Sequence, residues 1–152
     1  MLAAASLSAC GFHLQGAFNT PVEMKRTYIA SSDRYSLFVR EFAARLRSAG
    51  VELSDSAADA TATFTISFDD TSQRVLSVSA RNVPTEYEVY YTLAYSLDAG
   101  TTSLMPEQTL TLTRDYTYDS TLVLGKAREE ELLRDAIVQD LVSIVMKQIS
   151  TL

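Results

Sequence analysis

A change in hydrophobic period constrains the fold of this chain more than any other feature of its sequence. Between residues 60 and 118, apolar and polar side chains alternate, which is typical of β-strands with one buried face. The clearest stretch has a large apolar residue at every second position: Tyr87, Val89, Tyr91, Leu93, Tyr95 and Leu97. On both sides of this region apolar residues recur at steps of three and four, which indicates helices. The chain therefore has to bury one face of a sheet under amphipathic helices.

A first strand is predicted over residues 25–30, followed by a helix over 34–49 with N-cap candidates at 31–33. The apolar positions of this helix share one face: Tyr35, Phe38, Val39, Phe42, Leu46 and Ala49. Gly50 follows where a left-handed C-terminal cap belongs. Four basic or acidic residues lie off the apolar stripe: Arg40, Glu41, Arg45 and Arg47.

The alternating region is predicted to form four strands, over residues 60–68, 73–80, 86–97 and 108–118. Turn-forming residues separate them at 69–72, 81–84 and 99–106. After an irregular segment at 119–125, the apolar period predicts a long helix from Lys126 to Ser150. Its inward stripe is expected at Leu133, Ile137, Leu141, Ile144, Val145 and Gln148.

This order of elements predicts an α+β fold: a two-layer sandwich in which two helices pack on one face of a mixed, mostly antiparallel sheet of four to five strands. A right-handed crossover from the first strand through the helix to the second gives one parallel strand pair. The other sheet face is rich in Thr, Ser and Tyr. It is either an ordinary solvated face or a surface covered by a partner.

Composition limits the classes of function. With 47% hydrophobic and 21% charged residues the chain is globular, and its length suits a single domain, predicted over 24–152. The net charge of −6 argues against a nucleic-acid partner, because binding phosphates requires an excess of Lys and Arg on one face. An anionic ligand therefore needs a local basic patch.

Residues suited to catalysis are scarce. The one histidine, His13, lies in the predicted N-terminal tether, and the five glycines form no phosphate-binding loop. We therefore predict no enzymatic activity, no metal and no soluble cofactor. Arg81 in a turn and Lys126 at the start of the last helix could together hold a phosphate, with Lys25 or Arg128 nearby, if the fold brings those loops to one end. The alternative is that both are solvated loop charges.

The N-terminus contains a lipoprotein processing signal. Leu7, Ser8 and Ala9 precede Cys10, so that an apolar residue and two small ones stand before the only cysteine, after an apolar run. Cys10 is predicted to carry a covalent lipid, with residues 1–9 a remnant of the lipoprotein signal peptide and 10–23 the lipidated N-terminus and tether. The alternative is that Cys10 is a small buried hydrophobe. Gly11, where Asp would favour inner-membrane retention, indicates the outer membrane.

Several of these features together resemble the LptE family, the lipopolysaccharide-assembly lipoproteins of Gram-negative outer membranes. They are the 10–14 start (Cys-Gly-Phe-His-Leu), the strand and helix over 28–50, the Arg81 turn, the strand beginning at Glu86, and the terminal amphipathic helix. The resemblance implies a lipid-anchored protein on the periplasmic side of the cell outer membrane. It implies a heterodimer in which the protein plugs the LptD β-barrel, aids assembly of that barrel, and binds lipopolysaccharide for insertion into the outer leaflet. The family's basic ligand-binding positions correspond to Arg81 and Lys126.

A competing hypothesis is a periplasmic accessory lipoprotein of an inner-membrane lipid transporter. Such a protein would need an apolar pocket between its helices and its sheet to carry a lipid.

Overall fold

The computed structural model describes residues 19–118 and 123–152, without the side chains of 123–127. Cys10 and the predicted signal remnant lie outside the described residues, so lipid attachment stays a prediction. The elements follow in the order η1 (Val22–Lys25), β1 (Arg26–Ala30), α1 (Leu37–Ser48), β2 (Glu52–Ser54), η2 (Ala57–Asp59), β3 (Ala62–Val78), β4 (Pro84–Ala99), β5 (Thr102–Thr117) and α2 (Val123–Ile149).

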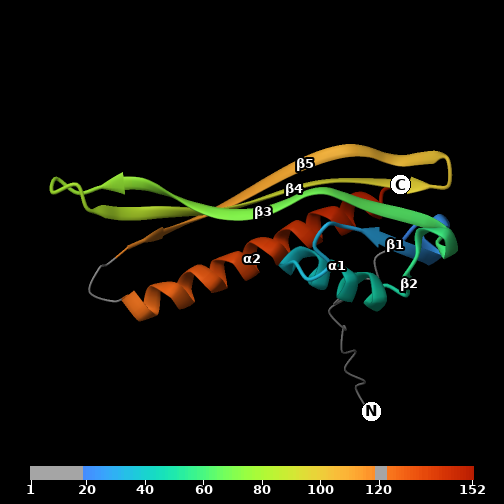
Figure 1. Ribbon diagram of the computed structural model, residues 1–152, viewed down its shortest axis with the longest axis horizontal. Helices are drawn as coiled ribbons and strands as arrows, with labels where there is room; N and C mark the ends of the chain where they lie inside the picture. The colour runs from blue at the N-terminus through green and yellow to red at the C-terminus, as the bar shows by residue number, and fades with distance from the viewer. Residues whose placement is uncertain (1–18, 119–122) are drawn as a thin grey trace, which may run out of the picture.

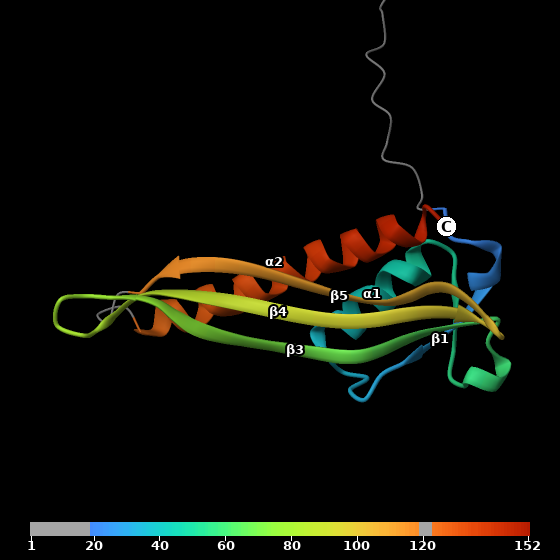
Figure 2. The same ribbon diagram turned by 90° about the horizontal axis from the view of Figure 1, so that it is seen from above.

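Both helices cover the same face of an open five-stranded sheet (Figure 1). The strand order is β2-β1-β3-β4-β5, and α2 runs along the three long strands (Figure 2). β1 pairs in parallel with both β2 and β3, while β3, β4 and β5 are antiparallel. The predicted α+β class is confirmed, but the sheet has two parallel pairs rather than one because the sequence pattern missed the three-residue strand β2.

The core lies between the two helices and the sheet. A row of aromatic rings crosses it from α1 through β3 to β4, with ring centroids 5.4 Å apart for Phe38 and Phe42, 4.5 Å for Phe42 and Phe64, and 5.3 Å for Phe64 and Tyr95. The Tyr95 hydroxyl donates a hydrogen bond to the Gln148 side chain of α2. This bond explains how a polar residue occupies the inward stripe of α2, because a buried hydroxyl needs a partner. Burial raises the pKa of Tyr95.

The predicted apolar faces are largely confirmed. All six alternating residues of β4 face the helices, with Tyr87 half-buried and the other five buried. In α1 the buried positions include Phe38, Val39, Phe42 and Leu46. Tyr35 is an exception, since its side chain is 85% exposed and precedes the helix.

Helix α1 begins later than predicted. Its N-cap is Ser36, whose Oγ accepts a hydrogen bond of 3.1 Å from the Val39 amide, and residues 34–35 form a preceding turn. The C-terminal cap at Gly50 is confirmed by its φ of +85°. The Gly50 amide donates to the Arg47 carbonyl and the Val51 amide donates to the Leu46 carbonyl, which is the Schellman pattern.

The turn predicted at 69–72 is wrong, because β3 continues through it to Val78. Ile66 pairs with Tyr95 and Phe68 with Ala94, so β3 carries one extra residue, Ser67, in a β-bulge. The bulge reverses which residues face the helices. Asp69 therefore points inward opposite Leu93, and Phe68 points outward with 51% of its side chain exposed.

The long reversal predicted at 99–106 is also wrong. β4 and β5 are joined by a tight turn at Gly100, which has a φ of +58°, and β5 starts at Thr102. Pro106 lies within β5 where the register slips, on an edge strand, and proline is tolerated in such a position. Helix α2 starts at Val123, three residues before the predicted start, and ends at Ile149.

Candidate functional site

The end of the molecule formed by the β3–β4 hairpin contains both basic positions singled out from the sequence. Figure 1 shows the hairpin projecting at the same end as the start of α2. Arg81 lies in the hairpin turn, and the backbone of Lys126 lies in the first turn of α2, although its side chain is outside the described residues. Lys25 in η1 lies at the opposite end (Figure 1), so the structure does not bring it to this site.

Hydrogen bonds to Ser79 shape the turn that presents Arg81. The Ser79 amide donates to the Val83 carbonyl at 2.8 Å, and the Asn82 amide donates to the Ser79 carbonyl at 2.9 Å. Asn82 has a φ of +59°, a left-handed conformation that asparagine tolerates better than most residues. The Arg81 side chain is exposed and, among the described residues, has no ion-pair partner. Arg128, by contrast, pairs with Glu131 at 2.6 Å.

The hairpin is also apolar. Four large hydrophobic side chains near its tip are about half exposed: Val75 (45%), Leu76 (45%), Val78 (53%) and Val83 (45%). Two register shifts in β3, between Val75 and Ser77 and between Ser77 and Val78, prevent these side chains from sharing one buried face. Arg81 therefore stands on an exposed apolar hairpin, an arrangement suited to a ligand with both anionic and apolar parts.

An open pocket of about 330 Å³ lies at the hairpin end of the sheet, with lining residues from β3, β4, β5 and α2. Three carboxylates line it, Glu86, Asp115 and Glu129, together with Tyr116. Burial, and secondarily the charge of Glu130, raises the pKa of Tyr116, whose hydroxyl donates to Gln73 at 2.9 Å. Three carboxylates in one pocket make it unfavourable for an anion.

The sheet face away from the helices is the second candidate surface. In β5 it presents Thr109, Thr111, Thr113 and Asp115, and in β4 it presents Glu86, Glu88, Tyr90, Thr92, Ala94 and Ser96. Neighbouring hydroxyls bond across the strands, as Thr92 and Thr111 do at 3.0 Å. Arg74 pairs with Glu88 at 2.5 Å. The face is therefore polar, with part of its charge neutralised.

Among the described residues, no three acidic, histidine or cysteine side chains are grouped to hold a metal ion. Nor does any helix in that part of the chain have the length and apolar character needed to cross a membrane.

Comparison with known proteins gives one family and a consistent fold. The model of the family described as LptE, lipopolysaccharide-assembly, matches residues 24–149. The crystal structure of rare lipoprotein B from Shewanella oneidensis is 24% identical and superposes with a TM-score of 0.71 over 83% of this chain and 94% of its own. A lipoprotein B from Nitrosomonas europaea, solved by NMR, is 26% identical with a TM-score of 0.76 over 93% and 91%. A minor lipoprotein from Acinetobacter baumannii is 21% identical with a TM-score of 0.70 over 86% and 94%. No curated protein sequence gives a match.

Proposed function

Because the chain belongs to the LptE family of lipopolysaccharide-assembly proteins, we propose that it is an outer-membrane lipoprotein that plugs the lumen of the LptD β-barrel. In this role it aids assembly of the barrel and binds lipopolysaccharide for insertion into the outer leaflet. The family match over 24–149 carries the proposal. LptE proteins assemble lipopolysaccharide and are not an enzyme family, so the proposed role requires no catalytic residues.

The sheet supports a role as a plug. Its Thr- and Ser-rich face can form hydrogen bonds with a polar barrel interior without bringing a large net charge into it. The elongated hairpin adds a second contact that reaches beyond the packed core (Figure 2).

The accessory-lipoprotein hypothesis has less support. It expected an apolar pocket between the helices and the sheet that could carry a lipid, but the described side chains of Phe42, Phe64 and Tyr95 fill the centre of that layer. An open groove at its margin is too small for a whole lipid.

The first test is a pull-down from outer-membrane extract with an affinity-tagged chain that carries a complete signal peptide, followed by mass spectrometry. A large β-barrel recovered at a one-to-one ratio supports the proposal. Recovery of an inner-membrane transporter complex, or of no partner, contradicts it and favours the accessory role. Mass spectrometry of the N-terminal peptide from the same preparation tests for acyl chains on Cys10.

Ligand binding is assigned to Arg81 and Lys126, as in the family. Replacing both with Asp reverses two charges, and we expect lipopolysaccharide binding to weaken by at least about tenfold, because each charged hydrogen bond to phosphate is worth roughly 1.5–3 kcal/mol. Barrel association should be nearly unchanged. The matched control is Arg114→Asp with Lys147→Asp, which changes the net charge equally at positions away from the hairpin. Unchanged binding in the Arg81 and Lys126 variant would remove these residues from the site.

A further inference from the structure

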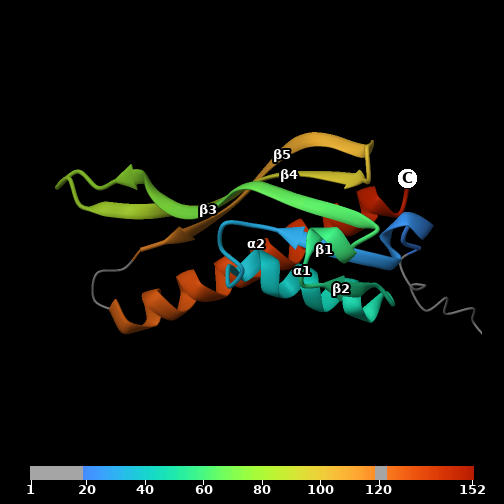
Figure 3. The ribbon, with the colours of Figure 1, turned by 45° about the vertical axis from the view of Figure 1, so that its right-hand side comes forward.

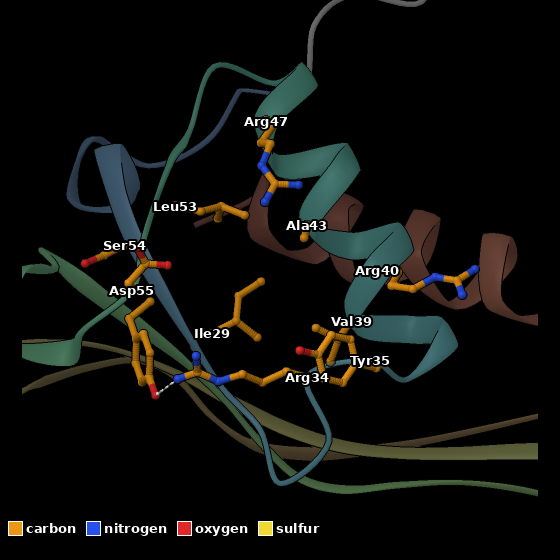
Figure 4. A pocket seen from close by; sticks show the side chains of 11 residues that line it. Ile29, Arg34, Tyr35, Val39, Arg40, Ala43, Arg47, Leu53, Ser54 and Asp55 are labelled. Atoms are coloured by element: carbon orange, nitrogen blue, oxygen red, sulfur yellow. Dashed lines mark hydrogen bonds between the residues drawn. The ribbon is translucent and has the colours of Figure 1, made fainter.

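Figure 3 shows α1 and the strands β1 and β2 together at the end of the molecule opposite the β3–β4 hairpin. An open groove of about 360 Å³ lies between α1 and these two strands, of which β2 is the edge of the sheet (Figure 4). Its floor is apolar, with Ile29, Val39, Ala43 and Leu53. Its volume is near the lower end of the roughly 300–1,000 Å³ typical of small-molecule pockets. It is therefore large enough for a head group and the start of one hydrocarbon chain, but not for a whole lipid.

Two guanidinium groups face this groove from opposite ends. Arg34 extends across it, its Nη2 donating to the Tyr28 hydroxyl at 3.0 Å, and Arg47 reaches in from the last turn of α1 (Figure 4). Arg40 lines the same groove, but its guanidinium points away along α1 (Figure 4). In the described part of the chain none of the three has an ion-pair partner.

The local charge is opposite to that of the whole chain. The two arginines that face the groove and one aspartate, Asp55, give it a formal charge of +2 − 1 = +1, whereas the chain carries −6. Charges separated by more than about 8 Å are largely screened at physiological ionic strength, so a ligand in the groove experiences mainly the arginines. Guanidinium groups bind phosphate through two parallel hydrogen bonds, and the apolar floor adds affinity for a hydrocarbon chain.

The position of the groove in the chain indicates the source of such a ligand. The described chain begins at Asn19 and passes through η1 directly into β1, which contributes Tyr28 and Ile29 to the groove. If Cys10 carries the lipid anchor, as proposed above, the nine residue steps from Cys10 to Asn19 span at most about 32 Å. The anchored protein then keeps this end near the surface of its membrane.

We infer that the groove between α1 and the β1–β2 edge binds the phosphate head groups of anionic membrane phospholipids, with Arg34 and Arg47 as the main contacts. This inference depends on the anchoring part of the proposed function, but not on the barrel or on lipopolysaccharide. Binding here would hold the β1–β2 end of the anchored domain at the membrane surface.

The test measures partition of the full chain, as the unlipidated Cys10→Ser protein, onto vesicles of phosphatidylglycerol and phosphatidylethanolamine. The test variant is Arg34→Gln with Arg47→Gln. The control is Arg114→Gln with Lys147→Gln, which removes the same charge at exposed positions outside the groove. We expect the test variant to partition on the order of 30-fold more weakly than the parent protein, and the control to stay within about threefold of it.

Three results would overturn the inference: no binding of the parent protein to these vesicles, an equal loss in both variants, or binding that is unchanged when phosphatidylcholine replaces the anionic lipid. Competition by polyglutamate without vesicle binding would assign the groove to an acidic protein segment. If circular dichroism shows that the variant with Arg34→Gln and Arg47→Gln does not fold, the test is the salt dependence of vesicle binding by the parent protein. Binding to charged head groups must fall steeply as the salt concentration rises, and binding that does not fall contradicts the inference. If the parent protein does not bind vesicles but recovers the barrel in the pull-down, only this inference is contradicted. If it binds vesicles but recovers no barrel, only the proposed role as a plug is contradicted.

Discussion

Asp69 joins the sheet to the start of α1 through a small network of hydrogen bonds. Its carboxylate accepts from the Tyr91 hydroxyl and, at 2.5 Å, from Oγ of Ser36, the residue that caps α1. Burial, and next the hydrogen bond to Asp69, raises the pKa of Tyr91 well above its usual range. A carboxylate beside the first turn of a helix is also favoured by the helix dipole. We infer that Asp69 positions the cap of α1, in contrast to its predicted place in a solvated turn.

Asp69→Ala should lower the free energy of unfolding by about 2 kcal/mol, because it leaves the buried Tyr91 hydroxyl without its acceptor. The measurement is urea unfolding monitored by circular dichroism. Asp70→Ala is the matched control, since the neighbouring side chain is exposed on the other face of β3 and its loss should cost less than about 0.5 kcal/mol. Equal losses in the two variants would show that the network contributes no stability.

The Asp69→Ala variant should also change how the stability of the protein depends on pH in the alkaline range. In the native protein the raised pKa of Tyr91 means that the folded state retains a proton that the unfolded chain releases above about pH 10. Stability is therefore full below that pH and falls as the pH rises further. Because Asp69→Ala removes the acceptor and its negative charge, the pKa of Tyr91 should fall toward its usual value, and the alkaline loss of stability should become shallower. Ultraviolet titration of the tyrosines provides the check.

At the scale of whole elements, periodicity predicted the features that local sequence determines, namely which face of a helix or strand is buried and where a helix ends. The buried faces of α1 and β4 followed from the spacing of their apolar residues, and the Gly50 cap from its residue type. In α2 the predicted stripe was right at Ile137, Leu141 and Val145 and only half-buried elsewhere. It missed the buried positions Val138, Val142, Met146 and Ile149. The turn at 69–72 failed because four polar residues resemble a loop, whereas pairing with β4 along the whole of β3 holds them in the sheet. Such pairing is a tertiary effect that overrides local preference.

The strand β2 was not predicted, and the first part of β5 was predicted as a turn, for related reasons. Three residues, 52–54, are too few to show a period, and Pro106 is a turn signal that an edge strand accommodates at a bulge. Arg81 and the start of α2 could be expected at one end, because the order of the strands dictates it. The arginine groove could not be foreseen, because Arg34 and Arg47 meet β2 only through the packing of α1 on the sheet edge.

The Ser67 bulge gives a prediction for β3. Because Ile66 faces the helices and Phe68 faces outward, deleting Ser67 leaves a regular alternation, and every later residue keeps its partner on β4. We expect this deletion to retain the fold at a cost of up to about 2 kcal/mol. Deleting Ser72 instead turns Arg74 toward the core, and we expect that protein to be destabilised by more than about 4 kcal/mol or not to fold. Thermal unfolding of both variants distinguishes them, and a Ser67 deletion as damaging as that of Ser72 would contradict the bulge register.

Taken as a whole, the molecule is asymmetric along its length. The core and α1 occupy the end that contains β1 and β2, and the β3–β4 hairpin extends away from it (Figure 1). Its apolar side chains are exposed to solvent. A hairpin with few buried contacts opens more readily than a packed core, because local stability follows local burial. The hairpin is therefore the part of the fold that gains most from a partner.

Hydrogen exchange measures this asymmetry directly. In the isolated protein, amides of 75–83 should exchange with an opening free energy at least about 2 kcal/mol below that of the β3 and β4 segments around Phe64 and Tyr95. In the complex recovered by the pull-down, protection should rise at 75–83 and along the Thr-rich face of β5, while the buried segments remain unchanged. Protection that rises only around the groove of Arg34 and Arg47 would place the partner at the other end. Such a result would require the hairpin and the polar sheet face to have a role other than contact with the barrel, because a plug must meet its barrel through the surfaces that the core leaves uncovered.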